Sequence, residues 1–277
     1  MGFAVELPVL NWSEVEEKIV SFLRDLKEKT GRKAVIGVSG GVDSATVLAL
    51  SVKAFGAKDV RAVIMPSQTT PPEDVEDAKE LIQKFGVTDW KIININKILK
   101  SYEETLGKMN KVVRGNTMAR IRMTILYALA HEDGLVIGTG DKSELLLGYF
   151  TKYGDGAVDV LPIGDLYKTW VRKLALHLGI PEKIALKPSS PRLWSGQLAE
   201  EELGIKYEVA DVILYGIVDE GLTPREVIEK YGVPEEAVRR VIELMKKNQH
   251  KLLPPPIVKV GKRTAFEFAP LISELEL

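Results

Sequence analysis

The segment at residues 34–44 constrains the fold most, because it combines a strand, a glycine turn and the start of a helix. Its sequence is AVIGVSGGVDS, and an apolar pattern with helical spacing follows at once, at Ala45, Val47 and Leu48. A short apolar run that leads into such a pattern is typical of a buried strand that turns directly into a helix. The two glycines allow a sharp turn, and the unpaired amides of a first helical turn bind anions. We therefore predict an anion-binding loop at residues 37–44.

Three polar side chains in this loop indicate which anion it binds. Ser39 and Ser44 add hydroxyl donors, and Asp43 places a carboxylate beside the anion site. A carboxylate is favourable there if Mg²⁺ lies between it and phosphate. The loop lacks the lysine of a Walker A motif and the spacing of a GxGxxG fingerprint. SGGVDS instead resembles the pyrophosphate-binding loop of the N-type ATP pyrophosphatases; the alternative is an ordinary strand-to-helix turn.

Strands alternate with helices along the first two thirds of the chain, which predicts a doubly wound parallel sheet with flanking helices, an α/β fold. The strands are expected at residues 34–38, 60–65, 91–95 and 135–138, and the helices at 13–30, 72–85, 97–106, 117–131 and 169–178. Ser13 is the predicted N-cap of the first helix, in a capping box with Glu16. Ligands bind outside the carboxyl ends of the strands in such sheets. Both SGGVDS and TGDKSE, at residues 139–144, follow strands.

The composition excludes several classes of protein. The 277 residues include 45% hydrophobic residues, and the net charge of −1 provides no general attraction to nucleic acid or to anionic membranes. The absence of cysteine excludes disulfides, thiolate metal sites and cysteine nucleophiles, and three histidines make a His-rich zinc site improbable. We find no run of about 18 apolar residues and no signal-peptide pattern, so we expect no membrane partner and a cytoplasmic location.

A second informative segment lies at residues 136–162. Glu144 follows Thr139 within one turn of a helix that starts at a strand end, so it is a candidate Mg²⁺ ligand opposite Asp43; the alternative is a surface glutamate stabilised by the helix dipole. The segment YFTKYGDGAVDVLP at 149–162 breaks the periodicity and combines glycine, lysine and aspartate. Such loops often form sites on a rigid scaffold, but they are also found as solvated surface loops.

Taken together, these segments resemble the ammonia-dependent NAD synthetases of the archaeal type. The similarity is carried by GVSGGVDSA at 37–45 and GTGDKSELLLGYFTKYGDGAVDVLPI at 138–163, and it continues through NTMARIRM, KPSSPRLWSGQLAEEELG and NQHKLLPPP. The tract around TKYGDG is the most specific of these motifs, whereas related enzymes share SGGxDS. The resemblance implies an adenine nucleotide α-hydrolase-like, Rossmann-like fold. It covers nearly the whole chain, as a single domain with a nucleotide-binding core at about 30–200 and a helical hairpin and tail at about 205–277.

The resemblance also implies roles for individual residues. The predicted ATP contacts are Gly37, Val38, Ser39, Gly40, Gly41, Val42, Asp43, Ser44, Thr139, Lys168 and Ser190, and Asp43 with Glu144 would hold Mg²⁺. The predicted deamido-NAD contacts are Arg120, Lys152, Asp159, His250 and Lys251. Asp43, Lys168 and Asp159 would be the catalytic residues, with Asp159 acting either on the ammonium proton or on the substrate. The family's dinucleotide-stacking aromatic residue has no clear counterpart near Leu26.

The implied reaction is the last step of NAD synthesis. The carboxylate of deamido-NAD would attack the α-phosphorus of ATP and release pyrophosphate, and ammonia would then displace AMP. Glutamine-dependent relatives carry an amidase domain with a catalytic cysteine, which this chain lacks. Free ammonia, or ammonia from a separate partner, is therefore the implied donor. The family also implies a homodimer, for which Ile121, Ile125, Leu126 and Leu129 are candidate contacts, although core packing is their default explanation.

Two alternatives remain open at this point. Another ATP pyrophosphatase, similar to GMP synthetase or to a tRNA-modifying enzyme, would share SGGVDS but not the loop at 152–156. The segment at 222–247 has the pattern of a helix-turn-helix with Arg239 and Arg240, which is found in DNA-binding proteins. Basic residues barely outnumber glutamates there, so a helical hairpin that packs on the domain is favoured, and we expect no nucleic-acid partner.

Overall fold

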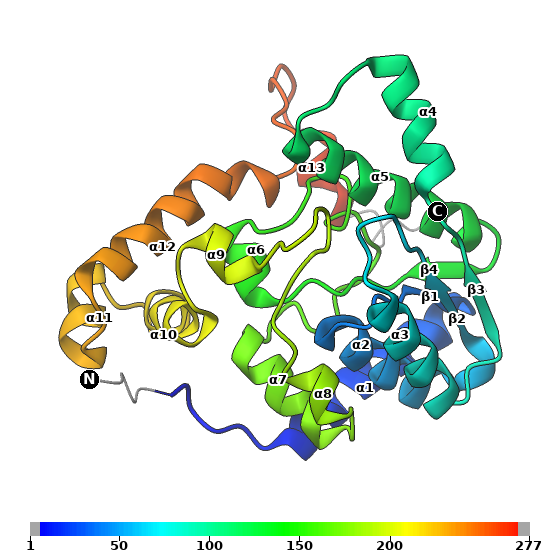
Figure 1. Cartoon of the computed structure of the whole chain (residues 1–277). Helices are drawn as coiled ribbons and strands as arrows, with labels where there is room; N and C mark the ends of the chain where they lie inside the picture. The colour runs from blue at the N-terminus through cyan, green and yellow to red at the C-terminus, as the bar shows by residue number, and fades with distance from the viewer. Residues whose placement is uncertain (1–5, 271–277) are drawn as a thin grey trace.

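Four parallel strands form the centre of the computed structural model, which describes residues 6–270. The order across the sheet is β3 (Asp89–Ile92), β2 (Val60–Ile64), β1 (Lys33–Gly37) and β4 (Gly134–Val136), as Figure 1 shows. In the register, Ala34 of β1 lies opposite Val60 of β2 and Leu135 of β4. The predicted parallel sheet is confirmed, and β1 is a central strand.

Both faces of the sheet are covered by helices. Ala34 and Ile36 belong to the main core, whereas Val35 between them belongs to a smaller cluster on the opposite face. The main core is formed with α1 (Trp12–Thr30), α2 (Val42–Phe55), α3 (Pro72–Lys84) and α7 (Lys168–His177). The opposite face packs against α5 (Lys111–Ala130). Because successive apolar side chains of β1 point to opposite faces of the sheet, helices cover both faces. This is the doubly wound arrangement that the sequence predicted.

Helices from the C-terminal part of the chain extend the main core on one side (left in Figure 1). It contains α10 (Tyr207–Val218), α11 (Pro224–Tyr231) and α12 (Glu235–Asn248), and α10 packs against α6 (Lys142–Leu147) and α7. Arg239 forms an ion pair with Glu235, and Arg240 pairs with Glu243 and donates to the carbonyl of Leu203. The segment at 222–247 is therefore the predicted hairpin that packs on the domain, and its arginines have partners within the chain.

The remaining elements are short or lie at the periphery. They are α4 (Asn96–Leu106), α8 (Glu182–Ala185), α9 (Ala199–Leu203), α13 (Ala265–Phe268) and the 3-10 turns η1 (Ala57–Asp59) and η2 (Gln249–Lys251). Within the described residues, no helix is long and apolar enough to cross a bilayer.

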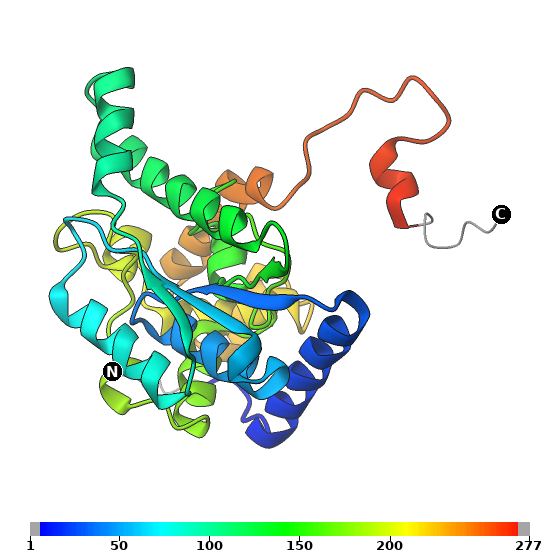
Figure 2. The same ribbon diagram turned by 90° about the vertical axis from the view of Figure 1, so that its right-hand side faces the viewer.

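Three expectations about element ends and the tail are corrected. The first helix is capped by Asn11, not Ser13, because the Asn11 side chain accepts from the amides of Ser13 and Glu14. Helix α5 begins at Lys111, earlier than predicted, because the Asn110 side chain caps it. Short apolar runs in the tail from residue 252 predict two strands, but the tail contains none up to residue 270; this segment leaves the body of the molecule and has no sheet edge beside it (Figure 2). The last seven residues lie outside the described part.

Candidate functional site

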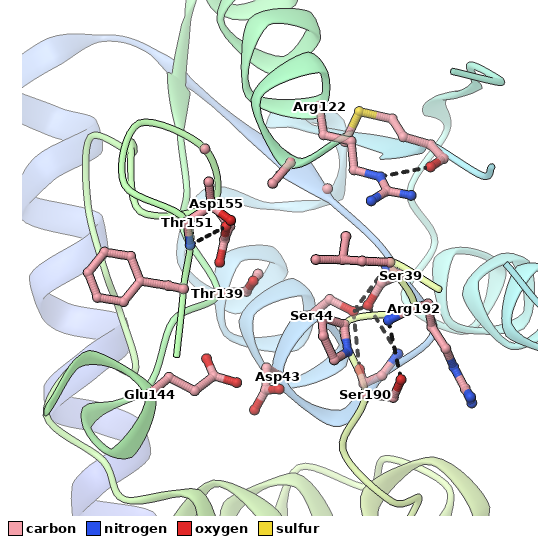
Figure 3. Close-up of a pocket in the computed structure, with 18 of the residues that line it drawn as sticks. Ser39, Asp43, Ser44, Arg122, Thr139, Glu144, Thr151, Asp155, Ser190 and Arg192 are labelled. Atoms are coloured by element: carbon pink, nitrogen blue, oxygen red, sulfur yellow. Dashed lines mark hydrogen bonds between the residues drawn. The ribbon is translucent and has the colours of Figure 1, made fainter. Parts of the chain in front are cut away.

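A cavity of about 500 Å³ lies at the carboxyl ends of the strands, where the fold predicted a ligand site. Its walls come from the ends of β1, β2 and β4, from one face of α5, and from the segments at 148–158 and 187–197. Figure 3 shows that polar side chains from these separate parts of the sequence point into one space. We refer to it as the central cavity.

The predicted phosphate loop forms one wall of the central cavity. All of its residues line the cavity except Gly40. The Ser44 hydroxyl accepts from the amide of Ser39 at 3.1 Å, and the Gly41 amide donates to the Ser39 hydroxyl at 3.3 Å. Helix α2 has Gly41 at its N-cap and no side-chain cap, so the amides of its first turn are available to an anion.

Gly40 sets the shape of this loop although it does not line the cavity. Its φ is +80°, and a Cβ atom at this position would lie 2.2 Å from the carbonyl oxygen of Asp74. A side chain is therefore excluded both by the backbone conformation and by the close approach of α3. This contact fixes the loop against the N-terminal turn of α3.

Below the loop, Lys168 joins three carboxylates in a group that we call the carboxylate cluster. The Nζ atom of Lys168 lies 2.8 Å from Asp43 Oδ2, 2.9 Å from Asp141 Oδ2 and 2.9 Å from Glu144 Oε1. The side chains of Lys168 and Asp141 are fully buried, whereas those of Asp43 and Glu144 reach the cavity. The predicted metal pair is thus brought together, by a lysine that was predicted to contact ATP.

Burial and mutual charge perturb the pKa values of Glu144, Asp141 and Lys168. Burial raises the pKa of Glu144 well above its usual range, and it also raises the pKa of Asp141; the ammonium of Lys168 opposes both shifts. For Lys168, burial acts to lower the pKa, but the three carboxylates outweigh it and raise the pKa well above the ordinary value. Lys168 therefore stays charged and keeps the acids close together.

The carboxylate cluster fits a cation whose remaining ligands come from a bound substrate. Asp43 Oδ1 is buried and has no hydrogen-bond partner within the described chain, and carboxylate oxygens are the ligands that Mg²⁺ prefers. Residues 6–270 contain no arrangement of three or more His, Cys, Asp or Glu side chains that would hold a metal by itself. Mg²⁺ commonly binds through one or two carboxylates together with substrate phosphates, which matches Asp43 and Glu144 beside the phosphate loop.

Helix α7 presents Lys168 at its first position and has no side-chain cap from Tyr167. Its first two amides are instead bound by other elements. The amide of Lys168 donates to Ser143 Oγ at 2.9 Å, and the amide of Thr169 donates to Asp211 Oδ2 at 2.8 Å. Ser143 in turn donates to Asp211 Oδ1 at 2.6 Å. Asp211 of α10 therefore fixes the backbone that carries Lys168.

Two further predicted ATP contacts also line the central cavity, Thr139 after β4 and Ser190 in the segment at 187–197. The Ser190 hydroxyl accepts from the amide of Arg192 at 3.2 Å. The segment is held over the cavity by ion pairs at 2.8 Å from Lys187 and Arg192 to Asp74.

The predicted dinucleotide contacts form a second group beside the cavity. Arg120 donates to the carbonyl of Lys152 at 3.3 Å, and Lys152 donates to the carbonyl of His250 at 2.7 Å. Lys251 lines the cavity and donates to the carbonyls of Gly148 and Phe150. Four of the five residues, all except Asp159, are thus linked through the segment at 148–153 and η2, which follows α12.

Asp159 lies apart from both groups. Its carboxylate accepts from the backbone amide of Val136 at 2.7 Å and from the Tyr127 hydroxyl at 3.1 Å, and it does not line the central cavity. In this structure it satisfies an amide at the outer edge of β4. A catalytic role for Asp159 remains a prediction without support from this geometry.

Asp141 and Arg122 are among the charged residues of the site that sequence reasoning missed. Asp141 completes a capping box with Glu144, a pattern that was visible as Asp-Lys-Ser-Glu at residues 141–144. Arg122 was not predicted, because the resemblance assigns the substrate contact to the neighbouring Arg120. Arg122 lies three positions after Ala119, and Ala119 and Arg122 both line the cavity. The helical period of α5 places residues 119, 122, 123 and 126 on one face, so the phase of that helix could have identified Arg122.

Comparisons with known proteins agree with this arrangement. A curated relative from Hyperthermus butylicus, named NH(3)-dependent NAD(+) synthetase, is 54% identical over 91% of this chain and 92% of its own length. The structure of NH3-dependent NAD synthetase from Campylobacter jejuni, in complex with the nitrate ion, has a TM-score of 0.77 and 32% identity over 90% of this chain and all of that one. The structure of NMN synthetase from Francisella tularensis has a TM-score of 0.80 and 33% identity over 90% and 99% of the two chains.

The family model described as NAD synthase matches residues 15–255, which include the phosphate loop, the carboxylate cluster and Lys251. The sequence similarity and the similarity of the folds each extend over about nine tenths of the chain. The chain therefore belongs to the NAD synthase family.

Proposed function

We propose that this protein is an ammonia-dependent NAD synthetase, which uses ATP to convert the nicotinate carboxylate of deamido-NAD into the amide of NAD. The observation that carries the proposal is the central cavity, in which an open helix N-terminus and the carboxylate cluster face Lys251 and the segment at 148–155. The first group suits a nucleotide triphosphate with its cation, and the second suits an anionic cosubstrate. The names of the curated relatives support the same reaction.

The reaction requires activation of a carboxylate, because its carbon is electron-rich and hydroxide is a poor leaving group. A carboxylate oxygen attacks the α-phosphorus of ATP, the bond to the bridging oxygen breaks, and pyrophosphate leaves. The product is a mixed anhydride of nicotinate and AMP. The amides of the phosphate loop and the hydroxyls of Ser39 and Ser44 would hold the departing pyrophosphate.

Mg²⁺, held by Asp43 and Glu144, would neutralise charge on the phosphoryl oxygens when it is bound. Lys168 contributes by keeping these two carboxylates at one place, since its ammonium lies between them. Phosphoryl transfer depends on positioning and on electrostatic stabilisation, so a preorganised pair of ligands favours it. Direct contact between Lys168 and ATP remains a prediction.

In the second step, ammonia attacks the carbonyl carbon of the anhydride, AMP leaves, and a proton is lost to give the amide. The chain has no cysteine and so cannot itself form the thioester by which glutamine-dependent relatives release ammonia. Ammonia from solution or from a separate protein is the proposed donor.

A second candidate is the amidation of the corresponding mononucleotide. The similarity to the NMN synthetase from Francisella tularensis supports this candidate, because that match also covers 90% of the chain. Both reactions would use the same carboxylate activation. They differ in whether the substrate carries an adenylate half, which the exposed Arg120 and the half-buried Lys152 beside the cavity would contact.

The test is the release of AMP and pyrophosphate from ATP with Mg²⁺ and ammonium, measured with each candidate acid. We expect deamido-NAD to have a kcat/KM at least tenfold above that of nicotinic acid mononucleotide, and xanthylate and tRNA to be inactive. Asp43→Asn should abolish most of the activity, whereas Asp25→Asn on the exposed face of α1 should retain it. Preference for the mononucleotide would select the second candidate, and activity only with xanthylate or tRNA would refute both.

A further inference from the structure

Arg122 is a cation inside the central cavity to which neither the predicted site nor the family match assigns a role. It is carried by α5, and its Nε donates to the carbonyl of Met65, at the end of β2, at 3.1 Å. Its guanidinium points into the cavity from the side opposite the carboxylate cluster (Figure 3). Burial lowers the pKa of Arg122 to about 10, which the charge of Asp155 partly offsets; the side chain is therefore still charged at neutral pH.

The other cations of the cavity wall have partners that account for them. Lys187 forms ion pairs with Asp74 and Asp77, and Arg192 forms one with Asp74. Lys251 donates to two backbone carbonyls. Within residues 6–270, Arg122 has no carboxylate within ion-pair distance, and one carbonyl is its hydrogen-bond acceptor.

Arg122 is half-buried, and a cation that is partly removed from water without an anion beside it destabilises a folded protein, because the desolvation of the charge is not compensated. A guanidinium also offers a planar fork of donors that matches carboxylate and phosphate oxygens. Arg122 lies on the wall of the cavity across from the phosphate loop. Its guanidinium donors therefore point to the space that a bound substrate would occupy. We propose that Arg122 binds an oxyanion of the substrates.

The proposal rests on the proposed function for the identity of that oxyanion. Two groups of the substrates have the required chemistry: the α-phosphoryl group of ATP and the carboxylate of the acid that is activated. Both must lie side by side for the first step, and Arg122 could bind either group. A cation here would also draw the two anions together, which lowers the repulsion between an attacking carboxylate and a phosphoryl group.

The experiment compares Arg122→Gln and Arg122→Lys with wild type and with a matched control, Arg225→Gln, on the exposed surface of α11. The KM values of ATP, deamido-NAD and ammonium are measured separately, and α,β-methylene ATP binding is measured by calorimetry. We expect Arg122→Gln to raise the KM of ATP or deamido-NAD at least tenfold and to leave the KM of ammonium within twofold. Arg122→Lys should recover part of the loss. A weaker affinity for the ATP analogue alone identifies the phosphoryl group; an unchanged one identifies the carboxylate.

Thermal melting without ligand separates this role from a structural one. Because Arg122 is a half-buried charge with no carboxylate within ion-pair distance in the described chain, Arg122→Gln should melt no lower than wild type, while its stabilisation by substrates should decrease. Substrate KM values equal to those of Arg225→Gln would overturn the proposal, as would a lower melting temperature with unchanged KM values. If Arg122→Gln does not fold, the same measurements on Arg122→Lys decide. Failure of the wild-type protein to amidate deamido-NAD would refute the proposed function, whereas the ATP-analogue affinities would still test Arg122.

Discussion

Gly40 shows how one residue can determine the geometry of a phosphate loop without contacting the ligand. Its positive φ and the 2.2 Å separation between a hypothetical Cβ and the Asp74 carbonyl oxygen both exclude a side chain. Gly56, at the other end of α2, has nearly the same φ of +79° but no atom within 4 Å of a hypothetical Cβ. Alanine substitutions at the two positions can therefore separate the effect of an unfavourable backbone conformation from the effect of a steric clash.

We predict that Gly40→Ala weakens ATP binding at least tenfold, because α3 and the loop must move apart to accommodate the methyl group. Gly56→Ala should cost about 1–3 kcal/mol of stability, which is typical of a non-glycine residue held in a sparsely populated backbone conformation with positive φ. Calorimetric titration with ATP and Mg²⁺, together with chemical denaturation, measures both effects. Equal ATP affinities of the two variants would show that the Asp74 contact does not shape the loop.

At the scale of elements, the beginning of α7 depends on contacts with residues that are distant in the sequence. Its first amides are bound by Ser143 of α6 and Asp211 of α10, and its first side chain holds the carboxylate cluster. Burial raises the pKa of Asp211 to about 7, and the charge of Asp141 adds to the shift, while bonds from Ser143 and Thr169 oppose it. The folded protein therefore holds a proton on Asp211 at pH values where the unfolded chain does not.

The sign of the resulting pH dependence follows from proton binding. Between about pH 4, the unfolded value, and pH 7, the folded state binds more protons at Asp211, so this group lowers the free energy of unfolding as pH rises. We predict that the stability advantage of wild type over Asp211→Asn decreases by about 2 kcal/mol between pH 5 and pH 7. Guanidinium denaturation at several pH values measures it, with Asp25→Asn as the exposed control. A pH-independent difference between wild type and Asp211→Asn would contradict the prediction.

The elements were largely predictable because their signals are local. Apolar strands before glycines, caps and helical periods located the sheet, the phosphate loop and the position of Glu144, and therefore the two candidate metal ligands. Lys168 was identified by resemblance, but its position between Asp43, Asp141 and Glu144 depends on how α7 packs against α6 and α2. Asp211 could not be recognised at all, because its partners are distant in the sequence and nothing near it marks a site.

At the scale of the whole molecule, the central cavity can hold the reacting groups of both proposed substrates, but it is too small to enclose both molecules completely. Its volume of about 500 Å³ lies in the range that a single small ligand fills, whereas ATP and a dinucleotide must bind together. Arg120 and Lys152 lie outside the cavity, and Arg120 is exposed. The residues suggested for a subunit contact, Ile121, Ile125, Leu126 and Leu129, pack against the chain's own cores, so the default explanation accounts for them.

We predict that the protein is a homodimer whose second subunit completes the dinucleotide site. Exposed apolar side chains at the start of α5, Val112 and Val113, and Leu106 at the end of α4 are available for such a contact. Light scattering at micromolar concentration should give twice the chain mass of 30.7 kDa. A monomeric mass that persists in the presence of deamido-NAD would contradict the prediction. The subunit contact was beyond sequence reasoning, since apolar helix faces serve cores and interfaces alike.

The central claim is that the substrate carboxylate takes the adenylyl group of ATP within the central cavity. The most direct measurement uses deamido-NAD labelled with ¹⁸O in its carboxylate, with ATP, Mg²⁺ and ammonium, and mass spectrometry of the products. One labelled oxygen should appear in the phosphoryl group of AMP, and NAD should retain the other. Labelled inorganic phosphate formed together with ADP, or AMP without label, would contradict the claim.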